Sequence, residues 1–411
     1  MVPIAVRRYV IVGAGVAGMT AAMAIRRLDA EGTIQVLTDE EHPFYARIRL
    51  PELLSGSATP GQLVLRKPQW YERNRIELRM GETAVDLDPV GRVVETSRGA
   101  RVPYDSLLLA TGSRANVPPI EGADRPGVFT LRTMANALAI KARVGAGGHR
   151  VCVIGGGVLG LEASYHMMKA GNAVEVIESF PRLLPRQTDP EASAILQRKL
   201  ESLGFAFQLN GRSKAIVGDG APEAVVLEDG RRVVCDTVLI SAGVRPTVRL
   251  AAKLGLRVER GIVVDDRMRT GVPDIYAAGD LIEHRGVTYG IWPPAERQGE
   301  VAGTNMALGD ATYGGSTIAN VVKVVGVDLF AAGDIDPAGI RKCVIVRDAA
   351  RGIYKKLVLD DGRISGAILL GDATDQRRVL RAIDSRREVQ VDLEALARWD
   401  LSCLDSTGEG P

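Results

Sequence analysis

The chain has 411 residues, 46% of them hydrophobic and 25% charged, which is enough for two or three domains. Its 52 basic and 50 acidic residues give a formal net charge of +2, which offers no reason to expect nucleic acid as a partner. No apolar run approaches the roughly 20 residues that span a membrane, and a strand begins too early to leave room for a signal peptide. We therefore expect a cytoplasmic protein without a membrane partner.

The residues at 1–113 begin with a strand–turn–helix pattern. We predict a strand at 9–12, a helix at 17–28 and a strand at 33–37, and then short strands at 76–80, 83–88, 92–96 and 106–110. The turn after the first strand is Gly13-Ala-Gly15-Val-Ala-Gly18. In such a turn the first glycine reverses the chain, the second lets a pyrophosphate approach, and the third allows the helix to pack on the strand.

The same plan returns in the second quarter of the chain. We predict a strand at 150–154, a helix at 159–170, a strand at 173–177 and a helix at 190–203, with Gly155-Gly-Gly157-Val-Leu-Gly160 as the turn. One such turn is common in α/β proteins, but two in the same context indicate two dinucleotide sites. Two dinucleotides in one chain suggest that electrons pass from one to the other.

The residue after the second strand of each unit is expected to bind the adenine ribose. In the second unit it is Glu178, whose carboxylate can accept hydrogen bonds from ribose hydroxyls and repels a 2′-phosphate. This favours NADH, although Arg182 and Arg186 lie nearby and keep NADPH open as an alternative. In the first unit the aligned residue is a threonine, and the acid follows one position later as Asp39.

The last third of the chain contains a Gly-Asp motif at 279–280, a helix from residue 294 and then a separate α+β piece. In that piece we predict a strand at 342–347, a hairpin at 355–369 and an arginine-rich helix at 375–387, with disorder only at 406–411. The four cysteines and four histidines of the chain show no metal-ligand spacing, so we expect no metal site.

Four motifs, in order, resemble those of the FAD- and NAD(P)-dependent pyridine nucleotide-disulfide oxidoreductase superfamily. They are the two glycine turns, Leu109-Ala-Thr111-Gly112 before the second turn, and Ala277-Ala-Gly279-Asp280 after it. The resemblance covers essentially the whole chain. It implies an α/β fold of two Rossmann-like domains, as in glutathione reductase, with a small α+β C-terminal domain. The implied boundaries are 1–113 and 242–317 for FAD, 114–241 for NAD, and 318–411 for the C-terminal domain.

The resemblance also implies which residues bind the cofactors. For FAD they are Gly13, Gly15, Gly18, Asp39, Arg47, Arg49, Ala84, Thr111, Gly112, Arg132, Asp280 and Ala295. For NAD they are Gly155, Gly157, Gly160, Glu178 and Gly243. The two arginines at 47 and 49 either hold a FAD phosphate or stabilise the charge of the reduced ring. Glu162 either orients the nicotinamide or forms a salt bridge.

Within the superfamily, the chain is most similar to NADH:rubredoxin reductases and to the flavin portion of NADH-dependent nitrite reductase. The similarity lies in segments 44–50, 292–299 and 322–330. Disulfide reductases carry redox cysteines beside the flavin, but residues 44–54 contain none, so disulfide reduction is disfavoured. Glu52 is a second departure, because ferredoxin reductases of aromatic-ring dioxygenases usually have lysine there.

We therefore expect NADH to reduce FAD and the electrons to leave for an external acceptor. The acceptor would be a small carrier such as rubredoxin or ferredoxin, or an iron–sulfur partner subunit. The arginine-rich helix is either a docking face for an acidic carrier or an ordinary solvated surface. Three alternatives stay open: an electron-input subunit of a larger metalloenzyme such as nitrite reductase, an NADH oxidase that uses dioxygen, and a flavin-dependent sensor.

Overall fold

The computed structural model describes residues 6–388 and 393–404, so the expectation for 406–411 lies outside the described residues. The described chain divides into two compact units. The first comprises residues 6–116, 132–138 and 244–315, and the second comprises 117–131, 139–243, 316–388 and 393–404. The three-part division into FAD, NAD and C-terminal domains stays a prediction.

The first unit is built on a five-stranded parallel sheet in the order β19-β7-β1-β2-β3. The strands are β1 (Arg8–Val12), β2 (Thr33–Leu37), β3 (Ile76–Arg79), β7 (Ser106–Leu109) and β19 (Ile275–Ala277). β1 lies at the centre, and its carboxyl end leads into the first glycine turn. The carboxyl ends of parallel strands are where open α/β sheets bind their ligands.

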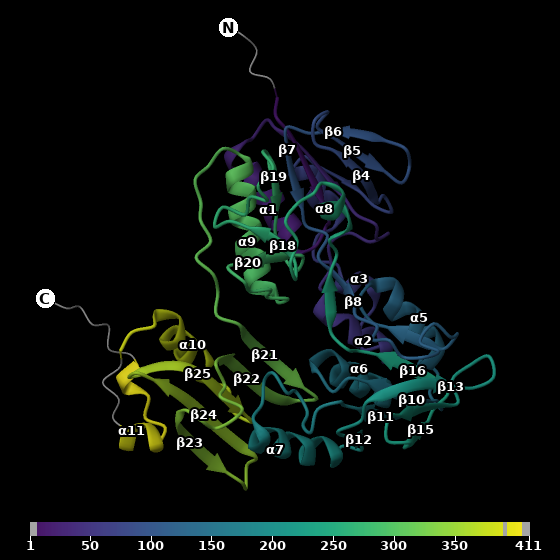
Figure 1. Cartoon of the computed structure of the whole chain (residues 1–411), viewed down its shortest axis with the longest axis vertical. Helices are drawn as coiled ribbons and strands as arrows, with labels where there is room; N and C mark the ends of the chain where they lie inside the picture. The colour runs from purple at the N-terminus through teal and green to yellow at the C-terminus, as the bar shows by residue number, and fades with distance from the viewer. Residues whose placement is uncertain (1–5, 389–392, 405–411) are drawn as a thin grey trace, which may run out of the picture. The chain divides into compact units, whose positions relative to one another are not determined.

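Two helices of the first unit, α1 (Val16–Leu28) and α9 (Trp292–Met306), lie side by side (Figure 1). Glycine makes this approach feasible, because a Cβ on Gly299 would lie 2.3 Å from the carbonyl oxygen of Ala17. One turn later, a Cβ on Gly303 would lie 2.4 Å from the carbonyl oxygen of Ala21. The small residues therefore hold α9 against the helix that follows the first glycine turn.

Shorter elements complete the first unit. The helical ones are η1 (Arg47–Arg49), α2 (Leu50–Leu54), α3 (Pro60–Leu63), α4 (Pro68–Arg73) and α8 (Arg249–Lys253). An antiparallel meander is formed by β4 (Ala84–Asp88), β5 (Val93–Thr96) and β6 (Arg101–Pro103). Two further pairs are β8 (Ser113–Ala115) with β17 (Val244–Pro246), and β18 (Ile262–Val264) with β20 (Ile282–His284).

The second unit begins with another five-stranded parallel sheet, in the order β12-β11-β10-β16-β9. Its strands are β9 (Val128–Thr130), β10 (Arg150–Ile154), β11 (Ala173–Ile177), β12 (Ala206–Gln208) and β16 (Thr237–Ile240). Its helices are α5 (Met134–Val144), which begins in the first unit, α6 (Val158–Lys169) and α7 (Pro190–Glu201). A small antiparallel sheet adds β13 (Ser213–Val217), β14 (Ala224–Leu227) and β15 (Arg232–Val234).

The rest of the second unit is an antiparallel sheet in the order β21-β22-β25-β24-β23. The strands are β21 (Ala319–Val324), β22 (Val327–Gly333), β23 (Lys342–Asp348), β24 (Ile353–Asp360) and β25 (Arg363–Leu370). The helical segments are α10 (Gln376–Ser385), α11 (Leu393–Ala397) and η2 (Ser402–Leu404). α10 buries Val379 and Ile383 in a core with Phe330 and Leu369 of the sheet.

The predicted α/β class, with two Rossmann-like units and an α+β C-terminal piece, is confirmed. The early strands, α6, α7 and the hairpin at β24 and β25 agree with the predicted positions within two residues. The helix expected from residue 294 starts earlier, at Trp292, because its prolines occupy the first turn, where a missing N–H costs nothing. Helix α5 and strands β21 and β22 were not predicted from the sequence.

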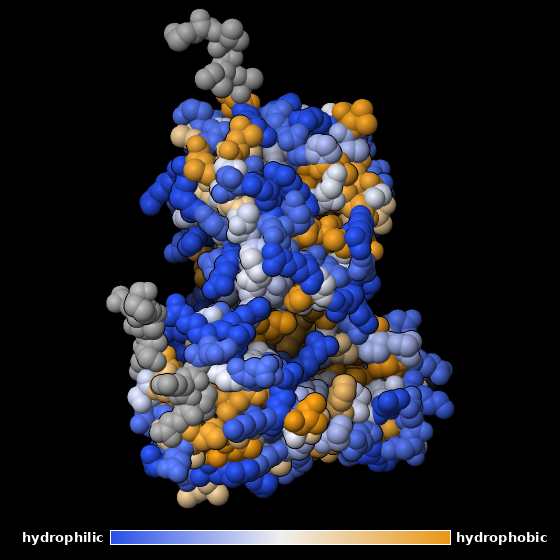
Figure 2. Space-filling model, turned by 60° about the vertical axis from the view of Figure 1, so that its left-hand side comes forward, coloured by the Kyte–Doolittle hydropathy of each residue, from blue (hydrophilic) through white to orange (hydrophobic). Residues whose placement is uncertain are grey.

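The apolar residues of each unit gather in buried clusters around these sheets. Hydrophilic residues cover most of the face drawn in Figure 2, with apolar ones scattered between them. Within the described ranges, every helix is too short or too polar to cross a membrane.

Candidate dinucleotide sites

The first glycine turn has the geometry that its sequence predicts. Gly13 has a φ of +115°, and a Cβ there would lie 2.2 Å from the carbonyl oxygen of Ala110. A Cβ on Gly18 would lie 2.0 Å from the carbonyl oxygen of Gly13. By contrast, a Cβ on Gly15 would meet no protein atom within 4 Å. The outer glycines are thus required by the fold, and the middle one faces open space.

The second turn repeats this geometry in the second unit. Gly155 has a φ of +121°, and a Cβ there would lie 2.3 Å from the carbonyl oxygen of Ser241. A Cβ on Gly160 would lie 2.1 Å from the carbonyl oxygen of Gly155, whereas one on Gly157 would meet nothing within 4 Å. The two turns therefore agree in all three glycine roles, although they lie in different units.

Glycines with the geometry of these two middle positions are rare in this structure. Among the described glycines, only four combine a φ outside the left-handed region with open space around the added Cβ. They are Gly15, Gly61, Gly157 and Gly314. Neither strain nor crowding requires glycine at the two middle positions, so the approach of a ligand is a physical reason for it.

Each middle glycine is also the N-cap of the following helix. Gly15 caps α1 and Gly157 caps α6, and neither helix has a side-chain cap or an acidic residue in its first turn. The first backbone N–H groups of both helices are therefore available to an anion, and the helix dipole favours one there. Two pyrophosphate groups, one in each unit, suit these positions.

Glu178 is placed at the second turn as predicted. It follows β11, is buried, and accepts hydrogen bonds from the backbone N–H of Gly156 at 2.8 Å and of Phe180 at 2.9 Å. Arg182 donates to the carbonyl oxygens of Thr188 and Pro185, so its guanidinium is engaged within the loop. The arrangement favours NADH over NADPH, since a fixed carboxylate repels a 2′-phosphate.

We predict that Glu178→Gln weakens NADH binding by about 10-fold without changing FAD content. The amide must turn its NH₂ group toward one of the two backbone N–H donors, so the side chain loses its position at the ribose. Steady-state kinetics with NADH as the varied substrate test this. An unchanged KM would show that Glu178 has only a structural role.

A partly buried polar network lies in the first unit. Arg47 donates to Glu40 at 2.7 Å, to the Tyr45 hydroxyl at 3.0 Å, and to the backbone oxygen of Arg132 at 2.8 Å. The Tyr45 hydroxyl donates to Glu40 at 2.6 Å. Burial acts to lower the pKa of Arg47, but Tyr45 and Glu40 outweigh it and raise that pKa. Arg47 is therefore a fixed cation.

Arg132 and Asp280, both predicted FAD residues, form an ion pair at 2.8 Å. The same carboxylate oxygen accepts a hydrogen bond from the Ser113 hydroxyl at 2.9 Å. Arg132 also donates to the Ser113 hydroxyl and backbone oxygen. These contacts leave the second carboxylate oxygen of Asp280 for another donor, such as a hydroxyl of a ribityl chain.

The other predicted FAD residues lie apart from this network. Arg49 is paired with Glu52 and donates to the backbone oxygen of Gln62, and Asp39 is exposed after β2. Ala84 is buried at the start of β4, and its carbonyl oxygen accepts a hydrogen bond from Arg249. The contacts of these residues with FAD stay predictions.

Five more predicted residues lie after strand ends or in helices. The Thr111 hydroxyl donates to the backbone oxygen of Thr247, and the adjacent Gly112 has a φ of +63°. Ala295 is buried in the first turn of α9. Glu162 is half-buried in α6, and Gly243 follows β16 with a φ of +84°. Their roles toward the cofactors also stay predictions.

One buried side chain near the first glycine turn was not predicted from the sequence. Gln298 of α9 accepts a hydrogen bond from the backbone N–H of Gly279 at 3.0 Å, but its buried Nε2 has no partner. An unpaired buried donor is costly and calls for a ligand or water. The packing of α9 against α1 and β19 brings this glutamine to the motif, so no local sequence signal indicates it.

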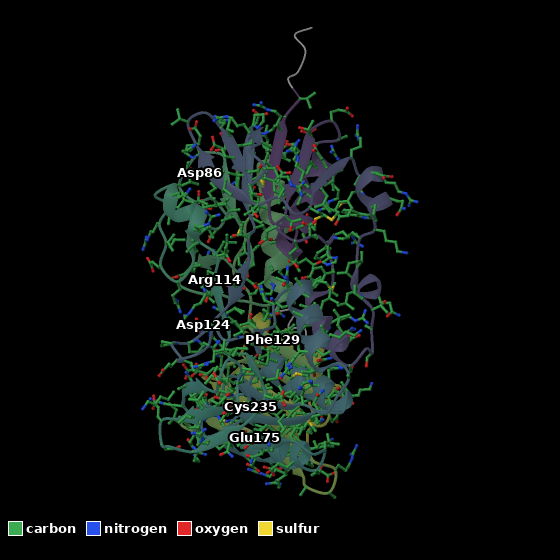
Figure 3. The ribbon with its side chains drawn as sticks, turned by 90° about the vertical axis from the view of Figure 1, so that its right-hand side faces the viewer. Asp86, Arg114, Asp124, Phe129, Glu175 and Cys235 are labelled. Atoms are coloured by element: carbon green, nitrogen blue, oxygen red, sulfur yellow. The ribbon has the colours of Figure 1, made fainter. Side chains whose placement is uncertain are left out.

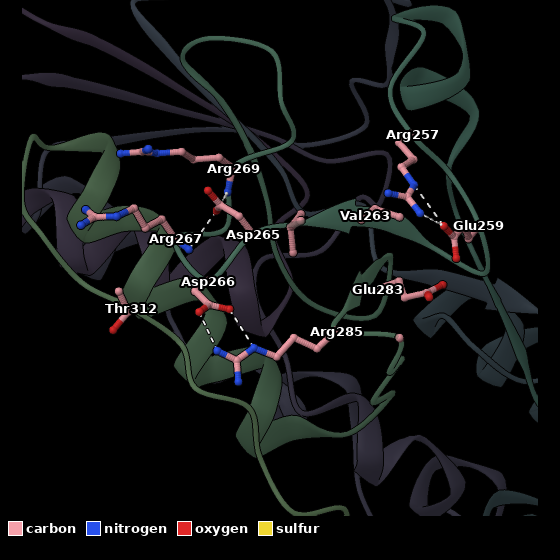
Figure 4. Close-up of a pocket in the computed structure, with 12 residues that line it drawn as sticks. Arg257, Glu259, Val263, Asp265, Asp266, Arg267, Arg269, Glu283, Arg285 and Thr312 are labelled. Carbon is pink, nitrogen blue, oxygen red and sulfur yellow. Dashed lines mark hydrogen bonds and ion pairs between the residues drawn. The ribbon is translucent and has the colours of Figure 1, made fainter.

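An open depression of about 720 Å³ lies elsewhere in the first unit (Figure 4). Its wall contains charged pairs such as Arg257 with Glu259 and Arg285 with Asp266. Hydrogen bonds from Arg285 and His284 lower the pKa of Asp266 to about 2. These charges neutralise one another within the wall.

Cys152, which is fully buried, lacks the environment of a catalytic thiol. Cys152 and Cys235 are buried, and Figure 3 marks Cys235 within the second unit. The contact with Cys235, together with burial, raises the pKa of Cys152 well above its usual value, so it is a poor nucleophile. Within residues 6–388 and 393–404, no group of three or more metal-ligand side chains is placed to hold an ion.

The two sheets and the two matching turns define an α/β protein with a dinucleotide site in each unit. The profile of the pyridine nucleotide-disulphide oxidoreductases matches residues 7–299, and that of the rubredoxin NAD⁺ reductase C-terminal domain matches residues 319–387. The chain belongs to the pyridine nucleotide-disulphide oxidoreductase family. This confirms the resemblance, and the predicted cofactors FAD and NAD(H) are those of the family.

Three similar proteins illustrate the range of the family. A nitrite reductase of Bacillus subtilis (strain 168) is 37% identical over 93% of this chain and 48% of its own length. An NADH-rubredoxin oxidoreductase of Clostridium acetobutylicum is 30% identical over 92% of this chain and 95% of its own length. Putidaredoxin reductase, in its covalent complex with putidaredoxin, is 25% identical with a TM-score of 0.86, covering 96% of this chain and 99% of its own.

Proposed function

We propose that the chain is an NADH-dependent flavoprotein reductase that passes electrons to a separate carrier. The observation that carries this proposal is the pair of glycine turns, each with a middle glycine that faces open space and caps a helix. The relatives that act with rubredoxin or putidaredoxin support the carrier, and the absence of cysteine from residues 44–54 argues against an internal thiol relay. The cytoplasm, where NADH is available, is the location that this function implies.

Residues at different positions hold different parts of the two cofactors. The N-termini of α1 and α6 bind the two pyrophosphates, and Glu178 orients the adenosine ribose of NADH. Arg47 and Arg132 keep positive charge beside the FAD turn, and Asp280 accepts hydrogen bonds from the ribityl chain. When bound, FAD would supply two-electron hydride chemistry toward NADH and one-electron chemistry toward the carrier.

The test of the carrier is reoxidation of the NADH-reduced protein. Stopped-flow mixing with rubredoxin or ferredoxin is expected to restore the yellow colour much faster than mixing with air-saturated buffer. Rapid, stoichiometric reoxidation by air alone would instead assign an NADH oxidase. Very slow reduction by NADH with a long-lived charge-transfer complex would assign a sensor.

The arginine-rich helix α10 is the proposed docking face for an acidic carrier. Arg377 and Arg381 are exposed on it, and electrostatic attraction raises association rates. We predict that Arg377→Glu combined with Arg381→Glu lowers the rate of carrier reduction at low salt by about 10-fold and weakens its salt dependence. Stopped-flow rates at several ionic strengths measure this.

The control for this prediction reverses two exposed charges that lie on strands of the same unit instead of on α10. The changes are Lys214→Glu in β13 and Arg232→Glu in β15. It is expected to change the rate by less than about twofold. If the α10 variant behaves like the control, α10 is an ordinary solvated helix and the carrier docks elsewhere.

A second function is favoured by one observation: the nitrite reductase of Bacillus subtilis, of which the chain spans about half the length, is 37% identical over 93% of this chain. The chain would then supply electrons to a metal-containing partner instead of a mobile carrier. Inactivity with every free carrier, together with co-purification of an iron–sulfur protein, would favour this function.

A further inference from the structure

Strand β24 of the C-terminal sheet carries a buried polar cluster. Lys356 is only 3% exposed, and its Nζ lies 3.2 Å from an Asp189 carboxylate oxygen and donates to the backbone oxygen of Asp336 at 2.9 Å. Tyr354, on the same face of the strand, donates its hydroxyl to the same Asp189 oxygen at 2.6 Å. A buried ammonium must be compensated in this way, because an unpaired one is strongly destabilising.

Asp189 connects this cluster to the NAD side of the second unit. It is the N-cap of α7, and its other carboxylate oxygen accepts the backbone N–H of Ala192 at 2.9 Å. One oxygen thus caps the helix while the other is held by β24. The start of α7 is therefore fixed by two side chains that are 165 and 167 residues further along the chain.

From α7 a continuous series of hydrogen bonds reaches the second glycine turn. The Ser193 hydroxyl accepts the backbone N–H of Leu183 at 2.9 Å and donates to the oxygen of the same residue at 3.1 Å. The next residue, Leu184, donates its backbone N–H to the oxygen of Gly156 at 3.1 Å. Gly156 in turn donates its N–H to Glu178. The loop 179–188 is thereby held between α7 and the NAD turn.

A second contact also joins the C-terminal sheet to α7, but it is an exposed ion pair. Arg347 of β23 forms a bidentate ion pair with Glu191 of α7 at 2.5 and 2.7 Å. Both side chains are about half exposed, and exposed ion pairs contribute little to stability. The hydrogen bonds of Arg347 go to Glu191 and not to Asp189, which acts on Arg347 only through its charge, so the pair serves as a control for the hydrogen-bonded contact of β24.

We infer that Tyr354 and Lys356 are positioning residues for NADH, which act through Asp189 to hold the 179–188 loop and Glu178 against the glycine turn. The inference rests on the proposed NAD site at Gly155–Gly160 and gives the C-terminal domain a part in it. Coupling through such a series of contacts can be demonstrated only by a change in binding, not by proximity.

The test uses the full-length, FAD-loaded protein with Tyr354→Phe and Lys356→Met. The measurements are the Kd of ADP-ribose, which carries the pyrophosphate and the ribose but no redox group, and the rate of flavin reduction at saturating NADH. Both variants are expected to raise the Kd by about 3- to 30-fold and to leave the saturating rate within about twofold. A general loss of structure would lower that rate and the FAD content as well.

Two variants serve as controls. Lys355→Met alters the neighbouring lysine, which is also buried but pairs with Asp372 on the opposite face of β24, and Arg347→Gln removes the exposed ion pair. Both should bind ADP-ribose as the wild type does. An unchanged Kd in Tyr354→Phe, which removes a single oxygen atom, would overturn the inference, as would an equal rise in both controls. A wild type that fails to bind ADP-ribose would refute the proposed NAD site itself.

Discussion

Replacing Gly157 by alanine is expected to give a folded, yellow protein that NADH reduces only at much higher concentrations. The backbone there has ordinary φ, and the added methyl group meets no protein atom within 4 Å, so the apoprotein has no reason to change. The only group that the methyl would crowd is the proposed pyrophosphate. Overpacking of this kind costs about 1–3 kcal/mol, which corresponds to roughly 10- to 100-fold in Kd.

The measurement is anaerobic stopped-flow reduction of the flavin over a series of NADH concentrations. The matched control is Gly61→Ala, since a Cβ there also meets nothing and no pyrophosphate is proposed nearby. The control should reproduce the wild-type dependence on NADH. If Gly157→Ala does so too, the pyrophosphate does not lie at this turn.

Replacing Gly15 by alanine is expected to weaken FAD binding by a similar factor, roughly 10- to 100-fold. The reasoning is the same, because the middle glycine of the first turn also has ordinary φ and open space around it. The loss should appear as a lower flavin content after gel filtration. It should also appear as a melting temperature that depends more steeply on added FAD, because a ligand stabilises the folded state by mass action.

The pair of variants separates the two sites. Gly15→Ala should lose flavin, and after saturation with FAD it should respond to NADH like the wild type. Gly314→Ala is the control in the same unit, since its added Cβ also meets nothing. A Gly15→Ala protein that keeps its flavin as firmly as this control would contradict the assignment of FAD to the first turn.

The glycine turns could be predicted because their requirements are local. A glycine with positive φ, a glycine that faces open space and a glycine packed against the backbone follow one another within six residues, so the sequence alone indicates them. Helix α5 also has a local signal, since Met134, Ala137, Ile140 and Val144 are buried at helical spacing, and the sequence analysis overlooked it.

Other features depend on residues that are distant in the sequence. The sequence of β24 contains two adjacent lysines, which suggests an exposed strand, yet both are buried. Acids from other elements compensate them, Asp189 for Lys356 and Asp372 for Lys355. No local pattern indicates these partners, so neither the cluster nor its connection to the second glycine turn could be predicted.

The central claim is that one chain holds FAD and is reduced by NADH. Anaerobic titration of the purified protein with NADH, followed by the absorbance of the flavin near 450 nm, tests it most directly. The yellow colour is expected to disappear upon addition of about one equivalent of NADH per flavin. A colourless protein that takes up no added FAD, or a flavin that stays oxidised in excess NADH, would contradict it.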